Sequence, residues 1–450
     1  MSADNIHKRT EGDVNFTEAR KAWQQTEIDT NTQELLDKDA RYFLHQSMST
    51  PCLDVLSNAK GSSIINTRGK SYLDFHGNNV HQLGFAHPLL VERLKGQLDD
   101  LTFSTRRYTN EKAIDFAEKL ASLLPSDLNR VLLTPNGSSA VGMAVKLARA
   151  VTGKFKVISF WDSFHGANLD AVSVGGESVF RDYMGPLMPG VERIPPPITY
   201  RGIYENNEQK CLEHLEYVLS KENGIGAFIA ETIRNTDVQI PSKEFWKEAR
   251  RLCDAYGVVL ILDEIPIGLG RTGKMFAFEY YGIEPDVLCL GKGLGGGIFP
   301  QAAIITRDDY NRFGDISLGH YTHEKSPLGS VAGLTTIEII ESENLLEKVQ
   351  QDELFLKERL RQLQTQYELI GDIRGMGLLW GIELVTDRIT KEKAVNEAEK
   401  VMYNCLRKGL SFKVSSGNVL QLSPPLTISR EDLVKAINIV EQSINEIYLV

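Results

Sequence analysis

Cysteine is scarce in this chain of 450 residues, and long apolar runs are absent from it. The five cysteines are scattered and contain no CxxC pair, which argues against a disulfide scaffold and indicates a reducing compartment. No cysteine–histidine cluster has the spacing of a zinc site. No stretch reaches the roughly 18 consecutive apolar residues of a membrane-spanning helix, and the first residues lack the apolar segment of a signal peptide. We therefore expect a cytoplasmic protein without a metal centre.

Runs of lysine and arginine are also missing, and the formal net charge is −10. A net acidic chain without a basic run is not expected to bind nucleic acid or a membrane surface. A small anionic substrate remains compatible, because a local pocket can be basic within an acidic whole. Hydrophobic residues make up 42% of the chain, which is enough for a sizeable core, and the length predicts two or three domains.

Short apolar runs alternate with amphipathic segments from about residue 110 onward. Strands are predicted at residues 130–134, 156–160, 227–230, 258–262 and 287–290, with helices at 111–124, 140–151 and 243–256. This alternation is typical of α/β proteins in which helices flank a mostly parallel, mixed sheet. The proline- and glycine-rich stretches at 184–202 and 293–300 are expected to be ordered loops.

The pattern changes after about residue 330. Helices are predicted at 327–342 and 345–367, and a glycine-broken pair of strands, a helix at 391–408 and a short strand near 419–422 follow. We therefore expect an N-terminal helical arm and segment at 1–62, a large domain at 63–330 and a smaller α+β domain at 331–450.

Four segments that follow predicted strands contain residues suited to chemistry, and ligands of open α/β sheets bind beyond the carboxyl ends of the strands. The turn at 135–140 (PNGSSA) opens a helix, where free backbone N–H groups and the helix dipole attract an anion. Its plain alternative is an N-capping turn. Asp263 and Glu264 end an apolar strand, where a carboxylate is costly without a cationic partner. Its plain alternative is an ordinary strand-end carboxylate.

The other two segments are those of Lys292 and Phe164. Lys292 stands between glycines, which leaves room for a bulky group on its amine. That amine becomes a good nucleophile only where burial or a nearby charge lowers its pKa. Phe164 is placed to cover the face of a flat ring. A surface lysine and a core phenylalanine are the plain alternatives.

Taken in order, the four segments resemble the class III aminotransferases, which are pyridoxal-5′-phosphate (PLP) enzymes of fold type I. The resemblance extends from about Ser63 to the C-terminus. Its strongest segment is Asp263–Gly273 (DEIPIGLGRTG), followed by Gly291-Lys292. Supporting segments are Tyr72–Phe75, His87-Pro88, Arg374–Leu378 and Pro424–Leu426.

The resemblance implies a role for each matching residue. Lys292 is expected to bind the cofactor as a Schiff base and to move protons during the reaction. Asp263 is expected to pair with the pyridine nitrogen and keep it protonated. Gly137 and Ser138 are expected to bind the cofactor phosphate.

Three further roles concern the ring and the partner subunit. Phe164 is expected to stack on one face of the ring, where the family often has tyrosine, and Ile265 to cover the other face. Thr322 matches a threonine that reaches the phosphate from a neighbouring subunit. A homodimer with shared active sites is therefore implied.

The chain departs from the family pattern at several positions. Pro266 stands where the family usually has glutamine, and Ser139 replaces an acidic residue. Residues 322–327 (THEKSP) replace a glycine-containing segment. No basic residue occurs at 418–423, where many members have an arginine that grips the carboxylate of the amino acid. A transaminase binds two substrates in turn, and the arginine that usually binds the carboxylate of one of them is thus absent from its usual position.

The family also contains lyases, and residues 74–80 (DFHGNNV) resemble the corresponding stretch of its phospholyases. Arg107 aligns with an arginine suited to a substrate phosphate, and Lys325 is a second candidate cation. The resemblance therefore implies a lyase that releases ammonia from a small anionic amine, (R)-1-hydroxy-2-aminoethylphosphonate, and yields phosphonoacetaldehyde.

In the implied reaction Lys292 takes a proton from the amine-bearing carbon and the adjacent hydroxyl leaves. A general acid is needed for this step, and Lys292 is the simplest candidate, ahead of His323 and Tyr108. The alternatives are an ω-aminotransferase acting on 2-aminoethylphosphonate with pyruvate, a phospholyase acting on an amino-alcohol phosphate, and a non-catalytic binding protein of the same fold.

Overall fold

The computed structural model describes residues 16–47 and 49–449, so the first fifteen residues of the expected N-terminal arm lie outside it. The described chain forms two compact units. Unit 1 comprises the residues up to Gly77, residues 84–86 and the chain from Gln351 onward. Unit 2 comprises residues 78–83 and 87–350.

Unit 2 is built on a seven-stranded sheet with the order β4-β10-β9-β8-β7-β5-β6. β10 is antiparallel to both of its neighbours, and the remaining pairs are parallel. The predicted α/β architecture with a mostly parallel sheet is therefore confirmed. The strands are β4 (Leu128–Thr134), β5 (Lys156–Phe160), β6 (Val191–Ile194), β7 (Ile225–Glu231), β8 (Val259–Asp263), β9 (Val287–Leu290) and β10 (Ala302–Arg307).

Two of these strands are absent from the sequence prediction. β6 lies within the stretch expected to be a loop, and β10 follows the glycine-rich segment at 293–300. β6 is only four residues long and pairs along one side with β5. Its formation depends on that pairing across more than 30 residues, which local sequence does not reveal.

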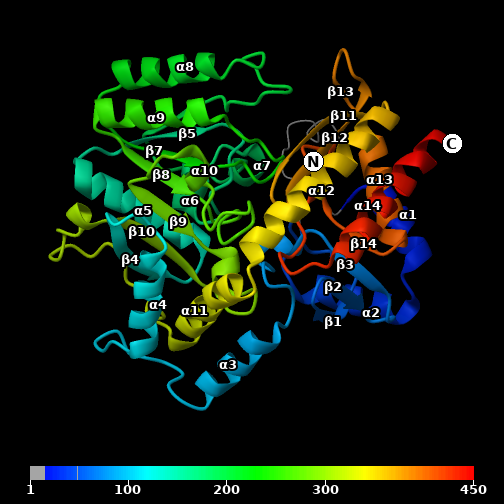
Figure 1. Cartoon of the computed structure of the whole chain (residues 1–450), viewed down its shortest axis with the longest axis horizontal. Helices are drawn as coiled ribbons and strands as arrows, with labels where there is room; N and C mark the ends of the chain where they lie inside the picture. The colour runs from blue at the N-terminus through cyan, green and yellow to red at the C-terminus, as the bar shows by residue number, and fades with distance from the viewer. Residues whose placement is uncertain (1–15, 48, 450) are drawn as a thin grey trace. The chain divides into compact units, whose positions relative to one another are not determined.

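Helices cover both faces of this sheet, as Figure 1 shows. Side chains alternate between the two faces of a strand. Accordingly, Ala227 and Ile229 join a buried apolar cluster with α5, whereas the ring of Phe228 lies on the other face beside Phe160, which contacts Phe245 of α9. The helices of unit 2 are α3 (Pro88–Leu98), α4 (Glu111–Ser122), α5 (Gly137–Thr152), α6 (Leu169–Val174), α7 (Ser178–Arg181), α8 (Glu208–Lys221), α9 (Lys243–Tyr256), α10 (Phe278–Tyr281) and α11 (Pro327–Ser342).

Unit 1 contains two smaller sheets, with orders β1-β2-β3-β14 and β11-β12-β16-β15. Its strands are β1 (Leu56–Lys60), β2 (Ser63–Asn66), β3 (Ser71–Asp74), β11 (Ile370–Met376), β12 (Leu379–Asp387), β13 (Glu392–Lys393), β14 (Leu410–Ser411), β15 (Lys413–Ser415) and β16 (Val419–Leu422). Its helices are α1 (Glu18–Glu27), α2 (Thr30–Tyr42), α13 (Val395–Arg407) and α14 (Arg430–Asn445), and α12 (Leu345–Gln366) begins in unit 2.

The helix expected at 391–408 begins later than predicted. Glu392 and Lys393 form β13, which pairs with β12, so that α13 starts only at Val395. Among the described residues, no helix combines the length and the apolar character that crossing a bilayer requires.

Candidate active site

The carboxyl ends of β7, β8 and β9 bring three titratable side chains to one edge of the sheet. Glu231 at the end of β7 is in register with Asp263 at the end of β8, and Asp263 is in register with Cys289 of β9. Lys292 follows two residues after the end of β9. The expectation that residues after successive strands meet at this edge therefore agrees with the register.

The carboxylate of Asp263 is buried and firmly held. Its Oδ2 is 2.8 Å from Nδ1 of His165, and its Oδ1 accepts a hydrogen bond of 3.1 Å from the backbone N–H of Ile265. The side chains of Asp263 and His165 are 2% and 0% exposed. Nε2 of His165 is buried and has no hydrogen-bond partner in the described part of the chain. His165 therefore orients the carboxylate of Asp263.

Glu231 is a second buried acid beside this pair. Its two oxygens accept hydrogen bonds from the backbone N–H groups of Phe164 (3.3 Å) and Asn235 (3.0 Å). Burial raises the pKa of Glu231, the charge of Asp263 raises it further, and His165 opposes both effects. Asp263 and Glu231 thus both lie within electrostatic reach of Lys292.

Lys292 is the cation at this edge. Burial lowers the pKa of Lys292, and the negative charges of Asp263 and Glu231 oppose that shift. The lysine makes no hydrogen bond or ion pair with another described residue. A lowered pKa makes more of the amine neutral and nucleophilic near neutral pH.

The backbone of Lys292 is held in an unusual conformation. Its φ angle is 48°, in the left-handed region that side-chain-bearing residues rarely adopt. The next residue, Gly293, has little room for a side chain, because a Cβ there would lie 2.0 Å from the nearest atom of the buried side-chain amide of Gln82. This strain, stored at a reactive amine, is a further mark of a functional position.

The turn that opens α5 lies next to this edge. Asn136 caps the helix by accepting a hydrogen bond of 2.9 Å from the N–H of Ser139. A Cβ on Gly137 would come within 2.9 Å of Cδ1 of Ile265, so the loop and Ile265 are in close contact. Ser138 Oγ accepts a hydrogen bond of 3.0 Å from the N–H of Ala167.

A pocket of about 280 Å³ joins this turn to Lys292. It is lined by residues 135–137, by Lys292, by residues 297–301 and by Val80. Phe164 packs its ring against Phe180 with the centroids 4.6 Å apart. The turn at the start of α5, Ile265 and Lys292 are thus brought together within one chain.

Of the predicted site residues, Gly137 and Lys292 line this pocket, whereas Arg107, Thr322 and Lys325 do not. Arg107, Thr322 and Lys325 are exposed. Their loops do meet, since Nδ2 of Asn110 donates a hydrogen bond of 3.0 Å to the carbonyl of Lys325. In the described part of the chain, neither cation makes an ion pair.

Glu264 has a structural role that its neighbour lacks. Its carboxylate is fully buried and accepts hydrogen bonds from the N–H groups of Ala277 (2.7 Å) and Phe278 (2.8 Å) and from the hydroxyl of Thr232 (2.9 Å). It therefore fixes the turn before α10. Burial raises the pKa of Glu264 to about 7, and the two backbone bonds oppose the shift.

The sequence prediction assigned no role to His165 or Glu231. The parallel order β8-β7-β5 makes both residues neighbours of Asp263. The sequence offered one signal for them, because each lies at or after the end of a predicted strand. Both side chains are buried in the structure. Buried polar side chains require hydrogen-bond partners. His165 has Asp263 as its partner, and Glu231 has the backbone N–H groups of Phe164 and Asn235.

Comparison with known proteins places the chain in a family. The model for aminotransferase class III matches residues 45–444. The chain belongs to the class III aminotransferases. A relative from Vibrio splendidus (strain 12B01), named (R)-1-hydroxy-2-aminoethylphosphonate ammonia-lyase, is 56% identical over 98% of this chain and 96% of its own length.

Other members show how widely the chemistry of this family varies. A leucine/methionine racemase from Thermococcus litoralis is 34% identical over 92% of this chain and 96% of its own. An amine transaminase from an uncultivated Pseudomonas species, solved in its PLP-bound form, superposes with a TM-score of 0.84 at 28% identity, over 90% of this chain and 98% of that one. Class III aminotransferases depend on PLP, and so does this chain.

The residues at the edge of the sheet fit that cofactor. Lys292 supplies an amine beside the pocket, Asp263 supplies a buried carboxylate for a pyridinium, and the start of α5 supplies N–H groups for a phosphate. The glycine at 137 leaves space that a Cβ would fill against Ile265. The assignment of each role to a residue remains a prediction.

Proposed function

We propose that this class III aminotransferase homologue is an ammonia-lyase acting on (R)-1-hydroxy-2-aminoethylphosphonate, which it converts to phosphonoacetaldehyde and ammonia. The 56% identity to the Vibrio splendidus lyase over almost the whole chain is the observation that carries the proposal. The absence of a basic residue at 418–423 supports it, because a lyase needs no grip for a second, keto-acid substrate.

The first step belongs to Lys292. When bound, PLP supplies an electron-accepting ring that stabilises negative charge on the substrate carbon. Lys292 Nζ, whose pKa burial lowers, takes the proton from the amine-bearing carbon. Asp263, held by His165 and the N–H of Ile265, would hold the ring nitrogen of the cofactor.

The second step is loss of the hydroxyl from the adjacent, phosphonate-bearing carbon. The proton that Lys292 Nζ has taken is donated to this hydroxyl, so that the C–O bond breaks and water leaves. The resulting enamine becomes an imine, and hydrolysis of the imine gives the aldehyde and ammonia. Water is released once and consumed once, so the overall reaction balances.

The substrate phosphonate requires a cation, and we propose Arg107 as the first candidate and Lys325 as the second. Both are exposed in the single chain, as is Thr322. We therefore propose a homodimer in which the partner completes the site with these loops. The five cysteines are free, which supports the expectation of a reducing, cytoplasmic location.

The decisive experiment measures ammonia without a keto acid. Purified holoenzyme is incubated with (R)-1-hydroxy-2-aminoethylphosphonate, and free ammonia and aldehyde are quantified. Equal amounts of both are expected in the absence of pyruvate. The matched control is 2-aminoethylphosphonate, which has no hydroxyl to eliminate and should release nothing. If amine loss requires pyruvate or 2-oxoglutarate, the protein is a transaminase and the lyase proposal is wrong.

A further inference from the structure

Two arginine side chains share the ring of Trp161, which directly follows β5. The guanidinium carbon of Arg181, at the end of α7, lies 4.9 Å from the ring centroid, and that of Arg193, in β6, lies 5.4 Å from it. The indole is 41% exposed, so this cluster is open to solvent. Stacking on an aromatic face holds a guanidinium while leaving its edge free to donate hydrogen bonds.

In the described part of the chain, no carboxylate pairs with either of the two guanidinium groups. Neither arginine forms an ion pair with any residue that the structure describes. Arg193 donates from Nε to the carbonyl of Gly175 (3.0 Å) and from Nη2 to that of Ser173. Nε of Arg181 is buried without a hydrogen-bond partner among the described residues.

The electrostatics of this cluster are unfavourable as it stands. The pKa of Arg193 is lowered to about 10, first by burial and then by the positive charge of Arg181, while Glu192 opposes the shift. Bringing like charges together in a partly desolvated place costs free energy unless an anion compensates. Arg181 retains the donors that such an anion requires.

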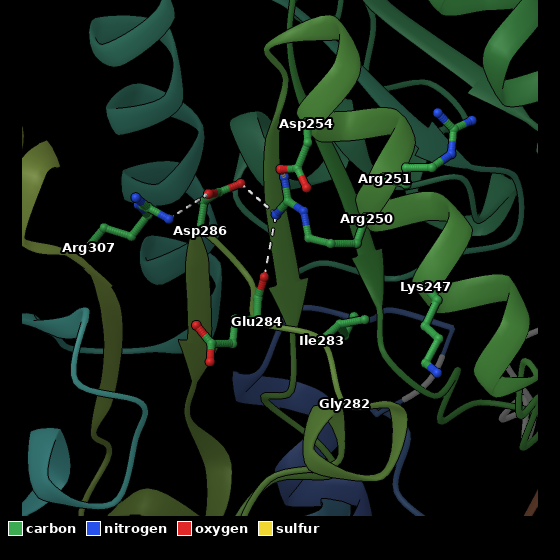
Figure 2. Close-up of a pocket in the computed structure, with 9 residues that line it drawn as sticks. All are labelled: Lys247, Arg250, Arg251, Asp254, Gly282, Ile283, Glu284, Asp286 and Arg307. Carbon is green, nitrogen blue, oxygen red and sulfur yellow. Dashed lines mark hydrogen bonds and ion pairs between the residues drawn. The ribbon is translucent and has the colours of Figure 1, made fainter.

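Another cluster of arginines in unit 2 shows the contrasting case (Figure 2). Around a pocket of about 490 Å³, Arg250 pairs with Asp254 at 2.7 Å and with Asp286 at 2.8 Å, and Arg307 lies 4.0 Å from Asp286. Those charges are neutralised by the protein's own carboxylates. Among the described residues, neither arginine at Trp161 forms such an ion pair.

We propose that Arg181, assisted by the field of Arg193, binds a tetrahedral oxyanion of the phosphate or phosphonate class at Trp161. A guanidinium presents two parallel N–H donors that match two oxygens of such a group. The ring of Phe180, the neighbour of Arg181 in sequence, packs on Phe164, and the backbone N–H of Phe164 donates to Glu231 beside Asp263. A phosphonate substrate and inorganic phosphate carry the same recognised group.

Intrinsic fluorescence can test this site directly. Trp161 is exposed, whereas Trp23, Trp246 and Trp380 are 1%, 0% and 3% exposed, so changes at the surface should report on Trp161. Holoenzyme is titrated with inorganic phosphate or with methylphosphonate, each at constant ionic strength against chloride. We expect a saturable change in emission with both anions and none in a W161F variant.

Variants separate this site from the active site. R181Q should weaken binding by about tenfold or more, since it removes the charged donor, while the absorbance of the bound cofactor stays unchanged. R251Q is the matched control, because Arg251 is exposed and already paired with Glu248. If R181Q does not fold, R181K keeps the charge without the paired donors and should weaken binding less.

Each result decides the question. A tighter response to methylphosphonate than to phosphate identifies the substrate class as the source of the anion, and the reverse order identifies free phosphate. The proposal is overturned if chloride gives the same change, or if R181Q or R181K titrates like the parent. None of these measurements depends on ammonia release, so they stand or fall independently of the proposed reaction.

Discussion

Two charged clusters lie at opposite edges of the same sheet and differ in how their charges are matched. At the carboxyl edge stand Asp263 and Lys292, beyond the ends of β8 and β9. At the amino edge, Asp286 immediately precedes β9, accepts a hydrogen bond of 2.8 Å from the N–H of Leu260 and pairs with Arg250 (Figure 2).

The larger of the two pockets is the one whose charges are matched within the protein. The amino-edge pocket is the larger, at about 490 Å³ against about 280 Å³, yet its principal charges are paired within the protein. At the carboxyl edge, Lys292 makes no ion pair with a described residue, and Nε2 of His165 is buried without a partner there. Incompletely matched buried charges lower stability and are typical of sites that bind and react.

Loss of the carboxyl-edge amine should have the largest effect. We expect K292A to lower turnover by at least about 10³-fold, because the side chain both holds the cofactor and moves the proton. The measurement is steady-state ammonia release together with the fraction of cofactor that borohydride fixes to the protein. K247A is the control, since Lys247 lines the amino-edge pocket, and it should retain full activity. Full turnover in K292A would remove the lysine from the mechanism.

The acid at the carboxyl edge comes next. D263N should lower turnover by about 10² to 10³-fold, because a neutral amide no longer stabilises a protonated ring nitrogen. The absorbance of the bound cofactor should change with it. D254N, which removes an acid from the amino-edge cluster, should leave both readouts as they are. Equal activity of D263N and the parent would contradict the assigned role.

Much of the carboxyl edge was predictable because its signals are local. Strands that end at Glu231 and Asp263, or shortly before Lys292, show as short apolar runs followed by a polar residue. The contact between His165 and Asp263 was not predictable in this way, because it joins residues 98 positions apart and depends on the order of β8, β7 and β5.

At the amino edge and in the small sheets of unit 1, the partners of the charged residues were likewise not predictable from local sequence. No local pattern distinguishes Asp286, whose partner is the guanidinium of Arg250, from Asp263, whose partner is the imidazole of His165. Likewise, residues 418–423 contain no basic residue, but the register of β15 and β16 places Lys413 opposite Gln421. Burial lowers the pKa of Lys413 to about 7. Pairing across strands decides which charges meet, and pairing is a property of the whole fold.

Glu264 lies next to Asp263 in the sequence, but its carboxylate accepts hydrogen bonds from Thr232, Ala277 and Phe278. Its pKa is raised to about 7 in the folded chain, above the ordinary value of 4.5, so folding favours its protonated form. The carboxyl therefore contributes stability below about pH 4.5, and this contribution is lost as the pH rises to about 7. Relative to the parent, E264Q should gain about 3 kcal/mol of unfolding free energy across that window.

The measurement for Glu264 is chemical denaturation of both proteins at pH 5, 6, 7 and 8. The unfolding free energy of E264Q, relative to that of the parent, should increase up to about pH 7 and then stay constant. A difference that does not vary with pH would show that the carboxyl titrates at its ordinary value. A matched pair of D372N and parent, which alters a partly exposed acid of unit 1, controls for general effects of charge.

The smallest expected effect is at the amino edge, and it should appear in stability alone. D286N keeps one acceptor but loses the charge that pairs with Arg250 and holds the N–H of Leu260, so we expect a loss of about 1–2 kcal/mol of unfolding free energy. Ammonia release at saturating substrate should stay within about twofold of the parent, since no side chain of this cluster faces the Lys292 pocket. The contrary outcome is that D286N lowers turnover as strongly as D263N while remaining folded. The two edges would then be coupled through the strands, and paired charges would no longer mark a purely structural cluster.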